Sequence, residues 1–272
     1  MRLPLPVNRG GRRRAPLVLL TAVLVLLLGA CTAARVATVP TVSYDSPQSA
    51  LRAIAPAAAL PALTATARIE IASATERYPL KAALMMKPPA SLRLESIPLL
   101  GTPDFFLTLN DSELRVFYPG KGLFYTGRAS AWALSHFIHL AIPPADIVSL
   151  LLGQAPVESE DGLSSWRGEP EGDLYRVDRY RAGQRISSLW IDPAGDRLVR
   201  IRVLTEGTTP PYTAEFSEHT RLGEAFVPRR LKITMEGLSF SLAYTELGPL
   251  ADGEAASFVL PVPEGIIPIP LQ

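Results

Sequence analysis

The 272-residue chain has very little cysteine and histidine, and beyond its first thirty residues it has no excess of positive charge. Cys31 is the only cysteine, and there are three histidines. The chain holds 27 Lys and Arg against 26 Asp and Glu, but five arginines precede Cys31, so the remainder carries 22 basic and 26 acidic side chains, a net of −4. Without a basic surplus to contact a phosphate backbone, we expect no binding of nucleic acid. With one cysteine, no internal disulfide forms, and the fold must rest on its apolar core.

Sequence patterns for catalysis and for metal binding are also missing. No serine lies in a Gly-x-Ser-x-Gly elbow. His136 and His139 are three residues apart in an expected helix, but no neighbouring Cys, Asp or Glu completes a metal site and His219 is distant in sequence. We therefore expect no catalytic residue, no metal and no cofactor, and we expect that the protein is not an enzyme.

Long hydrophobic runs are confined to the N-terminus. After Cys31 no stretch reaches the roughly 18 uninterrupted apolar residues that cross a bilayer. Before it, five arginines and no acidic residue precede an apolar run from Ala15 to Ala30. A charged start, a short apolar core and small residues before a cleavage point are typical of an export signal. The alternative is an uncleaved N-terminal anchor with an incidental cysteine.

The residues Leu28-Gly29-Ala30-Cys31 resemble a bacterial lipobox. The resemblance implies that residues 1–30 are a lipoprotein signal peptide and that Cys31 carries covalent lipid as the new N-terminus. Each buried methylene of such chains contributes about 0.8 kcal/mol, and two or more chains hold a protein firmly. Residues 31–45 would then be a lipidated tether with a reach of roughly 20 Å. By resemblance to proteobacterial sorting rules, Thr32 in place of Asp permits transfer to the periplasmic face of the outer membrane.

Helical and strand patterns alternate along the rest of the chain. Ser46 and Pro47 supply an N-cap and a first-turn proline for a short helix that ends near Ala55. From Leu63 onwards the apolar residues recur every second position, which predicts strands. The expected strands are 63–71, 78–84, 91–97, 105–109, 113–118 and 123–126, then 164–168, 174–181, 185–192, 198–204, 213–217, 229–236 and 238–244.

Two short helices are expected between these two groups of strands. Ser130 caps the first, and Pro143-Pro144 opens the second, which ends at Gly153. The strands read as an antiparallel meander with one apolar face, which the helices could cover. Four prolines between Phe258 and Gln272 predict a C-terminal arm, residues 251–272, that covers a sheet edge or extends freely.

This order of elements resembles the LolA/LolB family of lipoprotein carriers and acceptors, and its LolB branch in particular because a lipobox is present. The resemblance covers residues 46–250. It implies a mainly β, α+β fold: an incomplete antiparallel β-barrel of about eleven or more strands, with short helices covering an apolar cavity for acyl chains. Residues 142–153 resemble a family segment, but Leu150 or Leu151 stands where LolB usually has Trp.

The loop Ser96-Ile97-Pro98-Leu99-Leu100-Gly101-Thr102 resembles the Pro-Leu-Gly loop of LolB, whose exposed leucine places lipoproteins into the outer membrane. Leu99 and Leu100 are therefore candidates for a finger that contacts lipid or cargo, and the sequence does not choose between them. The alternative is that both leucines pack into the core. The residues expected to line the cavity are Leu84, Leu94, Phe105, Leu107, Val116, Leu134, Ile138, Ile147, Leu151, Ile201 and Phe240.

These features predict an outer-membrane-anchored lipoprotein that binds the acyl chains of lipoproteins and helps to insert them into that membrane. The expected partners are acylated lipoprotein cargo and a soluble periplasmic LolA-like carrier. Two alternatives remain open at this stage. One is a lipid-binding or envelope-sensing lipoprotein of the same fold, and the other is a structural lipoprotein whose core is filled.

Overall fold

The computed structural model describes residues 43–55, 60–110, 112–156, 163–204, 209–251 and 258–271. All of these belong to one compact unit, Val42–Gln272. The expected signal peptide, Cys31 and nearly all of the tether lie outside the described residues, so lipidation of Cys31 stays a prediction. None of the described helices has both the length and the apolar character that crossing a bilayer requires.

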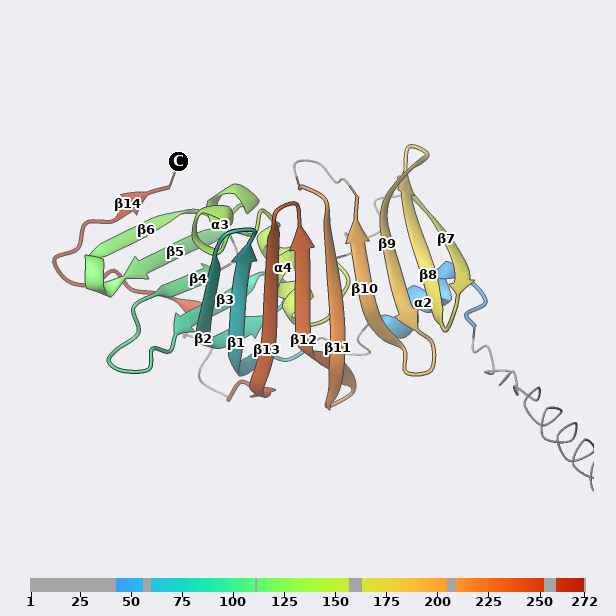
Figure 1. Cartoon of the computed structure of the whole chain (residues 1–272), viewed down its shortest axis with the longest axis horizontal. Coiled ribbons are helices and arrows are strands. Elements are labelled where there is room, and N and C mark those ends of the chain that lie inside the picture. Colours follow the sequence, from blue (N-terminus) through green and yellow to red (C-terminus); the bar gives the residue numbers. More distant parts are fainter. Residues whose placement is uncertain are drawn as a thin grey trace, which may run out of the picture. The chain divides into compact units, whose positions relative to one another are not determined.

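One large sheet contains all the described strands (Figure 1). Its strands are β1 (Leu63–Ser73), β2 (Arg77–Lys87), β3 (Ser91–Ser96), β4 (Phe106–Asn110), β5 (Glu113–Tyr118), β6 (Leu123–Arg128), β7 (Ser164–Glu171), β8 (Leu174–Arg181), β9 (Gln184–Asp192), β10 (Arg197–Val203), β11 (Tyr212–Leu222), β12 (Ala225–Met235), β13 (Leu238–Pro249) and β14 (Ile269–Pro270). The first thirteen pair antiparallel, in the order β6-β5-β4-β3-β2-β1-β13-β12-β11-β10-β9-β8-β7. Because this order is linear, the sheet stays open and forms the predicted incomplete barrel.

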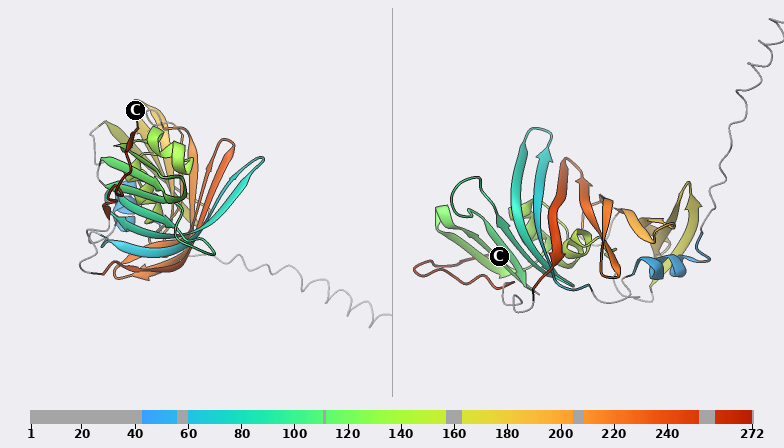
Figure 2. Two further views of the ribbon diagram at one scale, coloured as in Figure 1. Left: turned by 90° about the vertical axis from the view of Figure 1, so that its left-hand side faces the viewer. Right: turned by 90° about the horizontal axis from the view of Figure 1, so that it is seen from below.

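The sheet consists of two meanders that join where β1 pairs with β13. The chain completes the first meander at β6 and enters the second at β7, which is the last strand at the opposite end of the sheet. The connection between them carries α3 (Ala131–Ile138) and α4 (Pro144–Leu151). Both helices lie on one face of the sheet (Figure 2), and α4 contacts β3 and β12. The strand order therefore requires the helical segment to pass across the sheet, which confirms the expected cover.

Local sequence explains where the helices begin. In α2 (Pro47–Ile54), Ser46 and Ser49 form a reciprocal capping box, and Pro47 occupies the first turn. In α3, the Ser130 hydroxyl accepts a hydrogen bond from the backbone N–H of Ala133. Pro144 opens α4, whose residues Ile147, Val148, Leu150 and Leu151 are all buried. These three starts agree with the positions that the sequence predicts.

The two faces of the sheet differ in chemistry. In β1 the odd residues from Leu63 to Ile71 are buried, and the even residues, including Arg68 and Glu70, face outwards. We call the apolar side, where α3 and α4 lie, the inner face, and the other side the outer face. A strand buried on one side only produces such an alternation. The inner residues join one continuous hydrophobic core.

The C-terminal arm crosses back to the first meander. Phe258 and Leu260 are buried, and the guanidinium of Arg115 donates to the Leu260 carbonyl at 2.9 Å. Further along, β14 pairs parallel with β6, and the Leu271 N–H donates to the Thr126 carbonyl. The arm thus occupies hydrogen-bonding groups along β6 that would otherwise face solvent as a sheet edge.

Candidate functional site

An apolar cavity of about 900 Å³ lies between the inner face of the sheet and the two central helices. Its size falls within the range of roughly 300–1,000 Å³ that is usual for small-molecule sites. Strands β1, β2, β3, β12 and β13 form its floor, and residues at the ends of α3 and α4 form its roof. The apolar lining is Ile69, Ile71, Leu80, Leu84, Leu92, Leu94, Phe105, Phe137, Ile138, Leu140, Ile147, Leu151, Leu231, Ile233, Leu238, Phe240 and Leu242.

The structure brings seven of the eleven residues expected to line the cavity to its wall. These seven are Leu84, Leu94, Phe105, Ile138, Ile147, Leu151 and Phe240. The other four, Leu107, Val116, Leu134 and Ile201, are buried in the packed core and do not line it. Leu107 and Val116 are cross-strand neighbours on β4 and β5, and of these two strands only Tyr118, the last residue of β5, reaches the cavity. Leu134 is fully buried within α3. Ile201 lies on β10, two strands away from β12.

The helical roof is attached to the sheet at the end of α4. The buried hydroxyl of Tyr244 on β13 donates a hydrogen bond to the Leu151 carbonyl at 2.9 Å. Burial raises the pKa of this hydroxyl, which stays protonated and remains a donor. Gly153 has a φ of +72°, and a Cβ there would lie 2.3 Å from Cδ of Pro228. Glycine therefore allows both the turn that ends α4 and its close approach to β12.

One end of the cavity has a polar rim. It is formed by Glu76 from the turn between β1 and β2, Tyr78 near the start of β2, Lys121 from the short helix η1 (Pro119–Lys121), and His139 after α3. The Tyr78 hydroxyl donates to Oε2 of Glu76 at 2.5 Å, and this hydrogen bond raises the pKa of Tyr78. Nζ of Lys121 lies 5.4 Å from the ring centre of Tyr118, next to the lining residue Phe105. The interior is therefore suited to alkyl chains and the rim to a polar headgroup.

The loop between β3 and β4 spans residues 97–105, and residues 97–103 of it form an apolar finger. Leu99 and Leu100 have exposed fractions of 103% and 91%, so neither side chain packs into the core. Gly101 follows them with a φ of +93°, and a Cβ added to it would meet nothing within 4 Å. Two adjacent leucines exposed in this way form an apolar patch, which makes the finger a candidate contact surface for another apolar partner.

Ser96 and Asp104 close the base of this finger, and sequence reasoning missed both. The Ser96 hydroxyl donates to Oδ1 of Asp104 at 2.5 Å and accepts from the backbone N–H groups of Asp104 and Phe105 at 3.1 Å each. The Ser96 N–H donates to the Phe105 carbonyl, and the Ile97 N–H donates to the Lys81 carbonyl. The sequence signal for this closure is a serine at the end of a strand with an Asp eight residues later. This signal indicates a closed loop only once the loop length is known.

The three histidines lie in different surroundings. His136 is exposed, and its ring packs 4.3 Å from that of Trp132. His139 lies on the cavity rim, and Nε2 of His219 contacts the Leu198 carbonyl on the second meander. In the part of the chain that the structure describes, no group of His, Cys, Asp and Glu side chains could hold a metal ion.

Solved structures provide the comparison for this fold. No family model matches the chain, and no curated protein matches it in sequence. A LolA superfamily protein from Nitrosomonas europaea is 14% identical with a TM-score of 0.54, and the alignment covers 80% of this chain and 99% of that one. A domain from Vibrio parahaemolyticus described as an outer membrane lipoprotein-sorting protein is 12% identical with a TM-score of 0.55, covering 78% and 95%.

A DUF1329 family protein from Desulfovibrio piger is similar to the same degree, at 11% identity and a TM-score of 0.55, covering 78% and 96%. At such low identities the likeness concerns the path of the backbone and not the chemistry of the site. The predicted architecture is confirmed by this likeness and by the linear strand order. The chain therefore shares its overall fold with these solved structures, one of which is described as a LolA superfamily protein.

Proposed function

We propose that this protein is a lipid-anchored, LolB-like acceptor that binds the acyl chains of lipoproteins in its cavity and passes them to the outer membrane. The observation that carries the proposal is an apolar cavity with a polar rim in the same domain as two fully exposed leucines. The cavity provides a place for alkyl chains, and the finger provides a contact with the membrane. The lipobox at Cys31 supplies the anchor that keeps the domain at the membrane surface.

The proposed transfer involves no chemical step. Burying an alkyl chain contributes about 0.8 kcal/mol for each methylene, in the cavity as in the bilayer. Transfer between them is then close to balanced, and contact with the membrane controls its rate. The proposed roles follow: the inner-face residues hold the chain, the rim faces the headgroup or peptide of the cargo, and Leu99 and Leu100 enter the bilayer. A soluble LolA-like carrier would deliver the cargo to the rim.

Native mass spectrometry of residues 42–272 tests the binding step. This segment contains every described element and the whole described core, so it is a self-contained folding unit. We expect it to gain the mass of a synthetic diacylated lipopeptide. Changing both Leu238→Glu and Ile138→Glu should abolish the gain, because both residues line the cavity and are only partly buried.

A matched control is Leu222→Glu, because Leu222 is also partly buried against the core but does not line the cavity. This control should bind lipopeptide as the unaltered segment does. A segment that binds phospholipid but no lipopeptide would favour the alternative of a lipid-binding or envelope-sensing protein. A segment that takes up neither would contradict the proposal and favour a structural role.

A further inference from the structure

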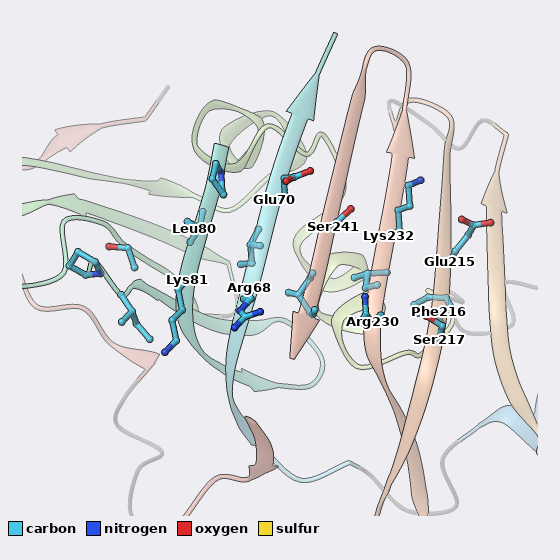
Figure 3. Close-up of a pocket in the computed structure, with 18 of the residues that line it drawn as sticks. Arg68, Glu70, Leu80, Lys81, Glu215, Phe216, Ser217, Arg230, Lys232 and Ser241 are labelled. Carbon is cyan, nitrogen blue, oxygen red and sulfur yellow. The ribbon is translucent and has the colours of Figure 1, made fainter. Parts of the chain in front are cut away.

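A second concave region lies on the outer face of the sheet, and it carries more charged side chains than the cavity does. It is a groove of about 1,380 Å³ over β1, β2, β11, β12 and β13 (Figure 3). Pro98 and Leu99 of the finger also line it, so the groove is continuous with the finger. On β13 the outward positions are Ser241 and Ala243, whose short side chains form a low floor. Longer side chains on the neighbouring strands stand on either side of this floor. The groove therefore results from the order of small and large residues across the strands.

Among the charged side chains along the groove, basic ones outnumber acidic ones. Its basic residues are Arg68, Lys81, Arg200, Arg230 and Lys232, and its acidic residues are Glu70, Asp104 and Glu215. All three acidic groups are already engaged: Glu70 pairs with Arg77, Glu215 pairs with Arg200, and Asp104 accepts from Ser96. Arg230 pairs with Glu218 outside the groove at 2.7 Å.

Three cations remain available for a ligand. Arg68, Lys81 and Lys232 are exposed, and none forms an ion pair with any carboxylate among the described residues. Arg68 lies directly opposite Lys81 on the adjacent strand, and Arg230 lies in the same register across Ala243. Like charges directly opposite each other destabilise a sheet. Because the chain after residue 30 has a net charge of −4, this row is not the result of a general basic excess.

We propose that this groove binds the anionic headgroups of membrane phospholipids and, together with the finger, sets how the domain lies on the bilayer. Charge complementarity next to an apolar tip favours this ligand, because exposed leucines enter the acyl region while flanking Lys and Arg contact headgroup phosphates. Leu99 itself lines one end of the groove, so both contacts can be made by one surface. The inference rests on the membrane-facing part of the proposed function and does not depend on what the cavity holds.

Vesicle flotation with residues 42–272 tests the groove. Vesicles of phosphatidylcholine alone are compared with vesicles that also contain phosphatidylglycerol. The variant Arg68→Ala/Lys81→Ala/Lys232→Ala should bind the anionic vesicles roughly a hundredfold more weakly, since each Lys or Arg near an anionic surface contributes about 1 kcal/mol, or roughly fivefold. Its binding to neutral vesicles should not change. The charge-preserving variant Arg68→Lys/Lys81→Arg/Lys232→Arg should retain binding.

Lys87→Ala is the matched control, because Lys87 is exposed on the same strand and face as Lys81 but lies roughly 20 Å further along β2, outside the groove. Leu99→Glu/Leu100→Glu should lower binding to both kinds of vesicle, which separates the finger from the groove.

Equal binding of the triple variant and the unaltered segment to anionic vesicles would overturn the inference. Binding to poly-glutamate without binding to anionic vesicles would also overturn it and would assign the groove to an acidic protein. Loss of anionic binding with lipopeptide uptake unchanged would support the groove, whatever the outcome for the cavity.

Discussion

The cavity and the finger are both built from leucine-rich sequence, but the protein exposes them very differently. Leu84 and Leu92 in the cavity wall are 1% and 2% exposed, because helices stand over them. Leu99 and Leu100 in the finger are fully exposed, because the chain leaves the sheet there and none of the described residues covers it. The two regions are joined by β3, which supplies Leu92 and Leu94 to the cavity and then leads into the finger.

This difference shows that the position of an apolar residue, and not its type, indicates its role. A covered apolar wall can hold a chain away from water, while an uncovered pair of leucines can enter a second apolar phase. The Ser96 and Asp104 contacts fix the boundary between the two, because they close the loop at Ser96, the last residue of β3 and the last of that strand to line the cavity. Changes to either region alone should therefore affect different steps of the proposed transfer.

The largest expected effect comes from changing the finger. Leu99→Glu/Leu100→Glu should lower the rate of lipopeptide transfer from residues 42–272 to vesicles roughly a hundredfold or more, since full burial of each leucine is worth about 1.5–3 kcal/mol. Uptake into the cavity and the melting temperature should not change, because both side chains are exposed. A fluorescent lipopeptide with a quencher in the vesicles measures the rate.

Ile267→Glu is the control for that experiment. Ile267 is 87% exposed, but it lies on the C-terminal arm, outside the finger. The control should transfer at the unaltered rate. If both changes slow transfer equally, exposed apolar area in general and not the finger controls delivery.

A smaller effect separates the cavity wall from the packed core. Leu94 and Leu107 face each other across β3 and β4, but only Leu94 lines the cavity. Leu107→Ala should lower the free energy of unfolding by about 3 kcal/mol, because it opens a new void in a filled region. Leu94→Ala should cost less, about 1–2 kcal/mol, because the space it leaves joins a cavity that already exists. Urea denaturation of both variants measures the difference, and equal losses would mean that the region around Leu94 is filled.

The smallest of these effects concerns the attachment of the helical roof. Tyr244→Phe should lower the free energy of unfolding by about 1 kcal/mol, the usual net contribution of a hydrogen bond, because the Leu151 carbonyl loses the donor that this hydroxyl provides. The same change should raise hydrogen exchange in α4, while exchange in the finger stays as before. An unchanged stability would show that this hydrogen bond does not hold the roof to the sheet.

Much of the architecture follows from the sequence because local rules decide it. Ser130 and Pro144 mark helix starts, and the alternation from Leu63 to Ile71 assigns one face of β1 to the core. The same alternation could not tell Leu94 from Leu107, because it specifies a face and not what stands opposite that face. For Ile201 on β10 the same reason applies, and for Leu134 the helical pattern of α3 likewise gives a buried side without telling packed core from cavity wall.

The outer groove lay beyond sequence reasoning for a different physical cause. Arg68 and Lys81 are far in sequence from Arg230 and Lys232, and the β1–β13 pairing brings these residues together. The local sequence of neither segment predicts that pairing. The finger was predictable in part. The prolines around Leu99 and Leu100 predict a loop, but only the structure shows that both side chains are exposed.

The most direct test of the central claim is the location of a bound acyl chain. A lipopeptide with a photoreactive group at the end of one acyl chain would be bound to residues 42–272, irradiated, and the modified residues identified by mass spectrometry. The account predicts modification inside the cavity, at residues such as Ile71, Leu84 and Phe240. Modification confined to the finger, the outer groove or the arm would contradict it, because the acyl chain would then bind outside the cavity.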